Sequence, residues 1–314
     1  MAGPIAKARH VIPRTRRRRG SSPLFRTVLL LAVALTSLLA LVAGRSAMVL
    51  NRAQGSAPVA TQVTVNGVQP GACMSFGPLA GPGDKTVFID PGHGGLDPGV
   101  VGTLAGRPVL EKDVALGVGT KLTSLLRADG YRVVMSRVAD SSVGRSAAAD
   151  VVGGALTASA VHQDLLARAA CANAAKASVL VSIHFNAFDD PSVGGTETYY
   201  DSARPFAPAS KRLAAALQSA VVSSLGSGDR GVWTDDQLVA PTLTSTGSVY
   251  GHLIELGPAA TGWVDNPSKM PGALVEPLFL TNPDEVRYAA ATAGQDRIAA
   301  ALRAGIEDYI TGTG

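Results

Sequence analysis

The 314-residue sequence has few cysteines, few charged residues and no acidic residue before Asp84. Two cysteines are too few for a disulfide-stapled mini-domain, and they lack the paired spacing of a structural zinc site. An apolar content of 46% and a charged content of 17% exclude a disordered tail protein, and no internal repeat is present. The length suffices for one large domain or two ordinary ones, each able to bury a substantial core.

The net charge of +4 is distributed unevenly. Residues 1–52 contain ten Lys or Arg side chains and no acidic one. The rest of the chain carries 18 basic and 24 acidic side chains, a net charge of −6. The basic character therefore belongs to one end of the chain, and the remainder gives no reason to expect nucleic-acid binding.

An uncharged apolar run, residues 27–44, follows the basic residues 1–26. The run is longer than the ~7–15 residues of a signal-peptide core and shorter than the ~20 residues of a spanning helix. The sequence leaves a cleaved signal peptide and a single-span anchor open as alternatives. Since arginines precede the run, both predict an exported protein, secreted or anchored in the periplasmic or cell-wall space, whose only membrane contact is residues 27–44.

Residues 45–84 are rich in Gly, Ala, Pro and Ser and are predicted to form a linker. A short strand at 61–65 is compatible with its sequence. Cys73 lies in this segment and Cys171 in a predicted helix. In an oxidising compartment the two are compatible with one disulfide, and two unpaired thiols are the alternative.

From residue 85 onward, β-branched apolar runs alternate with segments of helical period. This alternation predicts one α/β domain over residues 85–314, with a mostly parallel or mixed twisted sheet flanked by helices. The predicted strands are 86–90, 131–136, 178–184, 195–200 and 273–279. The predicted helices are 111–129, 162–176, 204–225 and one or two within 284–309.

Polar residues stand where strands of such a sheet end, which is where α/β sheets gather ligand-binding groups. His93 follows the first strand among glycines, and His184 ends a buried apolar strand. Glu111 begins a predicted helix, and Glu276 ends a late strand. Two histidines and one carboxylate, with a fourth position for water, match the ligand count of a catalytic zinc site.

Four segments carry a resemblance to the zinc-dependent N-acetylmuramoyl-L-alanine amidases, which are peptidoglycan hydrolases; they are residues 87–99, 110–116, 172–187 and 270–285. The resemblance implies that His93, Glu111 and His184 bind one zinc ion per catalytic domain, and that Glu276 is the catalytic acid/base. It also implies cleavage of the amide bond between the lactyl group of N-acetylmuramic acid and L-alanine of the stem peptide, in cell-wall remodelling.

The sequence departs from the family pattern around the expected catalytic glutamate. Pro277 and Leu278 follow Glu276, where the family often has glycine. Glu255 stands in a similar context, and we favour Glu276 because residues 279–285 continue as the family pattern requires.

Asp90 and Asn186 are candidates to orient an imidazole, although Asp90 is equally suited to shaping the loop before Pro91. The segments 137–163 and 226–272 are long for the family, and we expect them to form loops around the substrate groove. The expected partner is peptidoglycan or a muropeptide, and the expected state is a monomer. Two alternatives are a non-catalytic wall-binding module with the same fold and a zinc peptidase that acts on the stem peptide itself.

Overall fold

The computed structural model describes residues 60–238 and 250–312. The chain divides into two compact units, Met1–Ala57 and Pro58–Gly314, and the described residues belong to the second. The predicted leader (1–26) and the apolar run (27–44) lie outside the described residues. Among the helices that are described, none is both long and apolar enough to cross a membrane.

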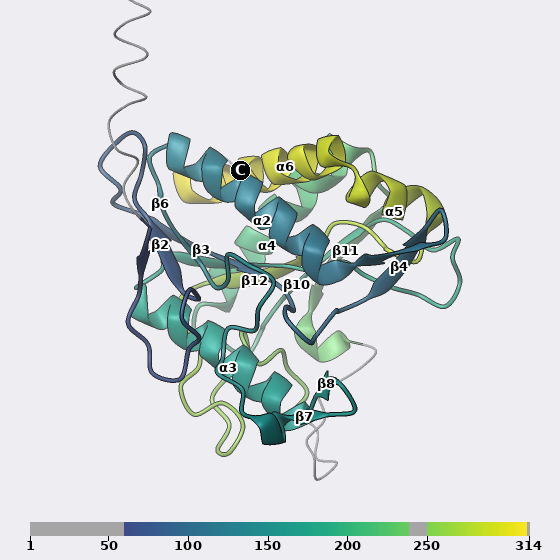
Figure 1. The fold of residues 1–314 in the computed structure, drawn as a ribbon. Coiled ribbons are helices and arrows are strands. Elements are labelled where there is room, and N and C mark those ends of the chain that lie inside the picture. Colours follow the sequence, from purple (N-terminus) through teal and green to yellow (C-terminus); the bar gives the residue numbers. More distant parts are fainter. Residues whose placement is uncertain (1–59, 239–249, 313–314) are drawn as a thin grey trace, which may run out of the picture. The chain divides into compact units, whose positions relative to one another are not determined.

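An eight-stranded mixed sheet forms the centre of this unit (Figure 1). Four of its seven neighbouring strand pairs are parallel, and the other three are antiparallel. In spatial order the strands are β1 (Thr61–Gln62), β2 (Met74–Phe76), β6 (Arg132–Met135), β3 (Thr86–Pro91), β9 (Val179–Ile183), β12 (Gly272–Glu276), β10 (Thr196–Tyr200) and β11 (Asp229–Thr234). Two small hairpins stand apart from the sheet, β4–β5 (Val101–Leu104 and Arg107–Leu110) and β7–β8 (Val151–Val152 and Ala155–Leu156).

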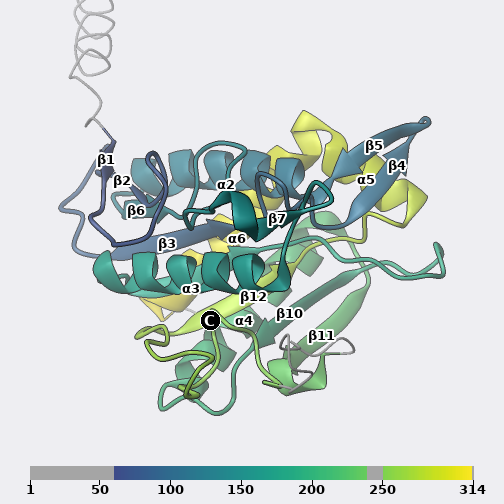
Figure 2. The ribbon, with the colours of Figure 1, turned by 60° about the horizontal axis from the view of Figure 1, so that its bottom comes forward.

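Helices cover both faces of the sheet (Figure 2). Thr157 caps one of them by accepting a hydrogen bond from the Ala160 amide, and Gly226 ends another with a positive φ of 67°. The faces are divided between α2, α4 and α6 on one side and α3 on the other (Figures 1 and 2). The helices are α2 (Glu111–Ala128), α3 (Ala158–Ala174), α4 (Ala207–Leu225), α5 (Pro283–Ala290) and α6 (Thr292–Thr311), with short 3-10 turns at η1 (Ala148–Asp150) and η2 (Asp235–Gln237).

The alternation of side chains along the strands separates two buried clusters. In β3, Val87 and Ile89 join the apolar core under α2, α4 and α6, whereas Phe88 packs on the α3 side. Each such fully buried side chain contributes about 1.5–3 kcal/mol to folding. Asp90 is two residues after Phe88, so its side chain points to the same face of the sheet. There it forms an ion pair with Arg168 of α3.

The folded unit begins earlier in the sequence than the predicted boundary at residue 85. Within the expected linker, 45–84, the strands β1 and β2 extend the sheet. Cys73 is fully buried and forms a disulfide with Cys171 of α3, across a sequence separation of 98 residues. In the chain-entropy model, a disulfide that closes a loop of this length stabilises the fold by roughly 4.7 kcal/mol, because it lowers the entropy of the unfolded chain. The Gly and Pro content therefore indicated the turns of this segment. The antiparallel pairing of β2 with β6, which makes the segment part of the sheet, has no local sequence signal.

Candidate active site and metal centre

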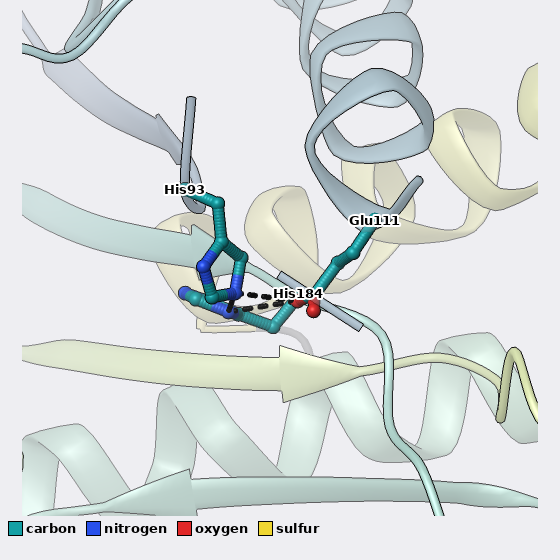
Figure 3. Close-up of side chains that lie close together, drawn as sticks. All are labelled: His93, Glu111 and His184. Atoms are coloured by element: carbon teal, nitrogen blue, oxygen red, sulfur yellow. Dashed lines mark hydrogen bonds and ion pairs between the residues drawn. The ribbon is translucent and has the colours of Figure 1, made fainter. Parts of the chain in front are cut away.

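Three side chains expected at a metal site point toward one another in the structure (Figure 3). His93 comes from the loop after β3, Glu111 is the first residue of α2, and His184 directly follows β9. We call these residues the His₂Glu cluster. His93 Nε2 lies 3.1 Å from Glu111 Oε1, and His184 Nδ1 lies 2.9 Å from the same oxygen and 3.1 Å from His93 Nε2.

These separations suit a tetrahedral metal ion. With metal–ligand bonds of about 2.0–2.1 Å, the ligands of tetrahedral zinc stand roughly 3.3 Å apart. Two imidazole nitrogens and a carboxylate oxygen are also the donor types that zinc accepts. The His₂Glu cluster therefore fits a catalytic metal site with one position left open.

Asp97 orients the first histidine of the cluster. Its Oδ2 lies 2.8 Å from His93 Nδ1, so the carboxylate holds the ring with Nε2 turned toward Glu111. Burial lowers the pKa of His93, but hydrogen bonds to Asp97 and Glu111 outweigh it and raise that pKa to about 10. Asp97 was not predicted from the sequence, although its position four residues after His93, in the same glycine-rich loop, was a usable signal.

Two buried arginines hold the backbone of the His93 loop. Arg137 donates to the carbonyls of Pro91 and Gly92, at 2.9 and 2.8 Å. Arg168 donates to the carbonyls of Pro91 and His93, at 3.0 and 2.6 Å. His93 itself has a φ of 61°, a left-handed conformation that costs a non-glycine residue energy. The guanidinium groups thus hold a strained loop in the shape that presents the imidazole.

Glu111 is held by both of its oxygens. Oε1 accepts a hydrogen bond from the Phe185 amide at 2.9 Å, and Oε2 accepts one from the Val100 amide at 2.7 Å. Burial raises the pKa of Glu111, but hydrogen bonds from His184 and His93 outweigh it and hold the pKa below its usual range. The carboxylate is therefore ionised and fixed in place.

Close packing at the cluster explains a glycine of the sequence motif. A Cβ at Gly92 would lie 2.3 Å from Cε1 of His184. No side chain can be added there without displacing a ligand of the cluster.

Glu276 ends β12 beside the cluster. Its side chain is partly buried, and Oε2 is a buried oxygen without a hydrogen-bond partner among the described residues. Burial and the nearby carboxylates of Glu111 and Glu197 raise its pKa well above the usual range, although the positive charge of His93 opposes this. Such a carboxyl group can carry a proton near neutral pH, as a general acid/base must.

The two residues expected to orient an imidazole do not hydrogen-bond one. Asp90 accepts hydrogen bonds from Arg168 and Ser182, because its side chain lies on the α3 face. Asn186 Nδ2 donates to Glu197, because its side chain turns toward β10. Among the described residues, the carboxylate that contacts Nδ1 of the His93 imidazole is that of Asp97, whereas Asp90 binds Arg168, which holds the His93 loop.

A cavity of about 170 Å³ opens beside the cluster. Both long segments, 137–163 and 226–272, contribute to its largely apolar wall. The lining residues include His93, His184, Leu156, Val161, Ile254 and Glu255. The side chains of His93 and His184 are 23% and 15% exposed to solvent, so the cluster is accessible.

Glu255, the rival glutamate, lies in this cavity on the side of Asp90 and Arg168. Neither of its buried oxygens has a hydrogen-bond partner among the described residues. Burial, together with the neighbouring Asp90 carboxylate, raises the pKa of Glu255 well above its usual range. For Asp90 itself, burial is outweighed by Arg168 and by hydrogen bonds, and the pKa falls to about 2. Of these two carboxyl groups, Glu255 therefore binds a proton more readily and Asp90 carries a negative charge more readily.

Comparison with known proteins identifies the family of this chain. Residues 87–308 match the family model described as N-acetylmuramoyl-L-alanine amidase. The amidase LytC of Bacillus subtilis is 32% identical over 225 residues, which cover 72% of this chain and 35% of LytC. The germination-specific amidase of the same organism is 29% identical over 237 residues, 76% of this chain and 83% of that protein.

Solved structures share the fold. An N-acetylmuramoyl-L-alanine amidase from Clostridium difficile 630 has a TM-score of 0.54 at 31% identity, and the match covers 74% of this chain and 100% of that one. The family match spans more than half of the chain and contains every member of the His₂Glu cluster together with Glu276. The chain therefore belongs to the N-acetylmuramoyl-L-alanine amidase family.

Proposed function

We propose that this protein is a zinc-dependent peptidoglycan amidase, which cleaves the amide bond between the lactyl group of N-acetylmuramic acid and L-alanine of the stem peptide. The observation that carries the proposal is the convergence of His93, Glu111 and His184 beside a buried, unpartnered oxygen of Glu276. Membership of the amidase family supports the choice of bond. Because peptidoglycan lies outside the cytoplasmic membrane, the proposal includes an extracellular or periplasmic location.

In this proposal the His₂Glu cluster holds zinc through His93 Nε2, Glu111 Oε1 and His184 Nδ1. When bound, zinc polarises the scissile carbonyl and acidifies water, lowering the pKa of water toward ~7. Asp97 keeps the His93 imidazole oriented, and Glu111 stays ionised because two backbone amides hold its oxygens.

Glu276 handles the proton. Its carboxylate accepts a proton from the attacking water and delivers it to the amine of the leaving L-alanyl peptide. The burial that raises the pKa of Glu276 favours keeping the proton on its carboxyl group between the two transfers. Leu156, Val161 and Ile254 give the cavity beside the cluster an apolar wall.

The test is product mass from defined disaccharide–peptide muropeptides, using the full-length chain in detergent with and without a zinc chelator. We expect an intact disaccharide and a free peptide that begins with L-alanine, and no products with chelator. Peptide fragments that leave residues on the sugar would identify a zinc peptidase, and binding without any products would identify a wall-binding module.

Glu276→Gln tests the assigned acid/base. We expect kcat to fall by ~10²–10⁴ while zinc stays bound, because the substitution removes the proton carrier and leaves the ligands in place. Glu255→Gln is the matched control, and we expect its kcat to stay within about tenfold of the wild type. The reverse pattern would move the catalytic role to Glu255.

A further inference from the structure

A second group of histidine and carboxylate side chains lies away from the His₂Glu cluster. Asp201 directly follows β10 and Asp235 directly follows β11. These two strands are parallel and their last residues pair, so the two aspartates are neighbours. Because β10 runs antiparallel to β12, its carboxyl end and the Glu276 end of β12 lie at opposite ends of the strands. His252 completes the group, which we call the Asp₂His cluster.

The inner atoms of this cluster converge while the outer atoms are held by the backbone. His252 Nδ1 lies 2.8 Å from Asp201 Oδ2 and 3.5 Å from Asp235 Oδ1. The other oxygen of Asp201 accepts a hydrogen bond from the Ala203 amide at 2.7 Å, and that of Asp235 accepts one from the Leu253 amide at 2.9 Å. Outer oxygens fixed in this way, with inner lone pairs directed at one point, are typical of carboxylates that ligate a metal.

Asp201 provides an independent indication of a ligand. Its side chain is 2% exposed, and Oδ2, which lies 2.8 Å from His252 Nδ1 as an ion pair, is without a hydrogen-bond partner among the described residues. Among the described residues, His252 is the ion-pair partner of both carboxylates. The nearby Arg204 guanidinium donates instead to the carbonyls of Gly257 and Ser268. Two buried carboxylates sharing one imidazole are costly unless a cation or a proton lies between them.

We propose that Asp201, Asp235 and His252 bind a second divalent metal ion, of the zinc type. One imidazole nitrogen and two carboxylate oxygens suit zinc, whereas calcium and magnesium prefer sites made of oxygen alone. The protein supplies three ligands, and water completes the coordination.

The position of the cluster indicates what the ion does for the protein. It joins the ends of β10 and β11 to the segment 250–257. The residues directly after His252, namely 253–256, line the cavity beside His93 and His184. The second ion therefore positions one wall of the substrate cavity and takes no part in the chemistry.

The test is zinc content per chain, measured by inductively coupled plasma mass spectrometry on the full-length protein in detergent after chelation and dialysis against zinc chloride. We expect two zinc ions in the wild type, and one each in Asp235→Asn and His93→Ala. The control is His162→Ala, which we expect to keep both ions because His162 contacts the Trp263 carbonyl at 2.7 Å and belongs to neither cluster.

One zinc ion in the wild type, lost in His93→Ala and kept in Asp235→Asn, would overturn the proposal and leave the Asp₂His cluster an ion-pair network. If Asp235→Asn does not fold, an anomalous difference map at the zinc edge from wild-type crystals decides. A peak about 2.0–2.2 Å from the three inner atoms supports the site, and a map with a peak at the His₂Glu cluster alone rejects it. Neither result depends on amidase activity, so the failure of one proposal is distinguishable from the failure of the other.

Discussion

The two histidine–carboxylate clusters place the same chemical groups at opposite ends of the strands of one sheet, in different proportions. The His₂Glu cluster has two imidazoles and one carboxylate beside a cavity of about 170 Å³. The Asp₂His cluster has two carboxylates with side-chain exposures of 2% and 0%, and each uses its outer oxygen on a backbone amide.

Ligand charge explains why these proportions suit different roles. A divalent ion with one carboxylate and two neutral imidazoles keeps a net charge of about +1, which strengthens the polarisation of a carbonyl. With two carboxylates the same ion is neutralised, so it cross-links segments without acting as a strong Lewis acid. Two features thus distinguish a reactive metal site from one that joins segments: the ratio of histidine to carboxylate ligands, and access to a cavity.

The largest expected difference between the clusters is in catalysis. We expect His93→Ala to reduce amidase turnover to background, because it removes one of the three proposed zinc ligands. We expect Asp235→Asn to leave kcat near the wild-type value and to raise KM by the equivalent of about 0.5–2 kcal/mol, because it acts only through the cavity wall. Steady-state kinetics on one defined muropeptide measures both, and a kcat effect of equal size in the two variants would contradict the division of roles.

The next largest effect concerns the support of the His₂Glu cluster. Arg168→Met leaves the buried Asp90 carboxylate without its guanidinium, and we expect it to lower the free energy of unfolding by about 3–5 kcal/mol. It also removes the donor to the His93 carbonyl, and zinc affinity should fall ~10–100-fold at this cluster, with the Asp₂His cluster unaffected.

Arg303→Met is the matched control for Arg168→Met, since Arg303 pairs with Asp129 at the surface. Its cost should be about 0.2–1 kcal/mol. Urea denaturation and chelator competition provide the two readouts. Equal costs for the two arginines would show that the His93 loop keeps its shape without Arg168.

The smallest expected effect is the pH dependence contributed by Glu255, which lines the cavity beside the His₂Glu cluster. Its folded-state pKa is raised above the unfolded value, so its contribution to stability is present below the unfolded pKa of about 4.3 and is lost as pH rises through the folded pKa. Glu255→Gln should therefore match the wild type in acid and exceed it in the free energy of unfolding at pH 8. A stability difference that is the same at both pH values would contradict a protonated Glu255.

The sequence predicted the α/β class and most of the elements around the first site. The strands ending at His93, His184 and Glu276 have the β-branched apolar runs of buried strands, and their ends are where such sheets collect ligands. The predicted helix 162–176 begins earlier, at Ala158, because Thr157 caps it. The strand β11 and the two hairpins were not predicted, because their residues lack the periodicity that identifies buried elements.

The directions in which the side chains of the site point could not be predicted from local sequence patterns. Asp90 and Asn186 stand near the histidines in sequence, yet their side chains turn to Arg168 and Glu197. The Asp₂His cluster could not be predicted from the sequence either, because its three residues come from three segments with no shared motif: Asp201, Asp235 and His252.

By itself, the sequence determined the family, the three residues of the His₂Glu cluster and the position of Glu276, because short motifs at strand ends record those choices locally. The carboxylate that orients His93 and the buried arginines that hold its loop could be identified only from the tertiary structure. The same is true of the second cluster, which forms after β10 and β11. The physical reason is that these contacts depend on strand order and side-chain direction. Both are set by the packing of distant segments and leave no period or spacing in the chain.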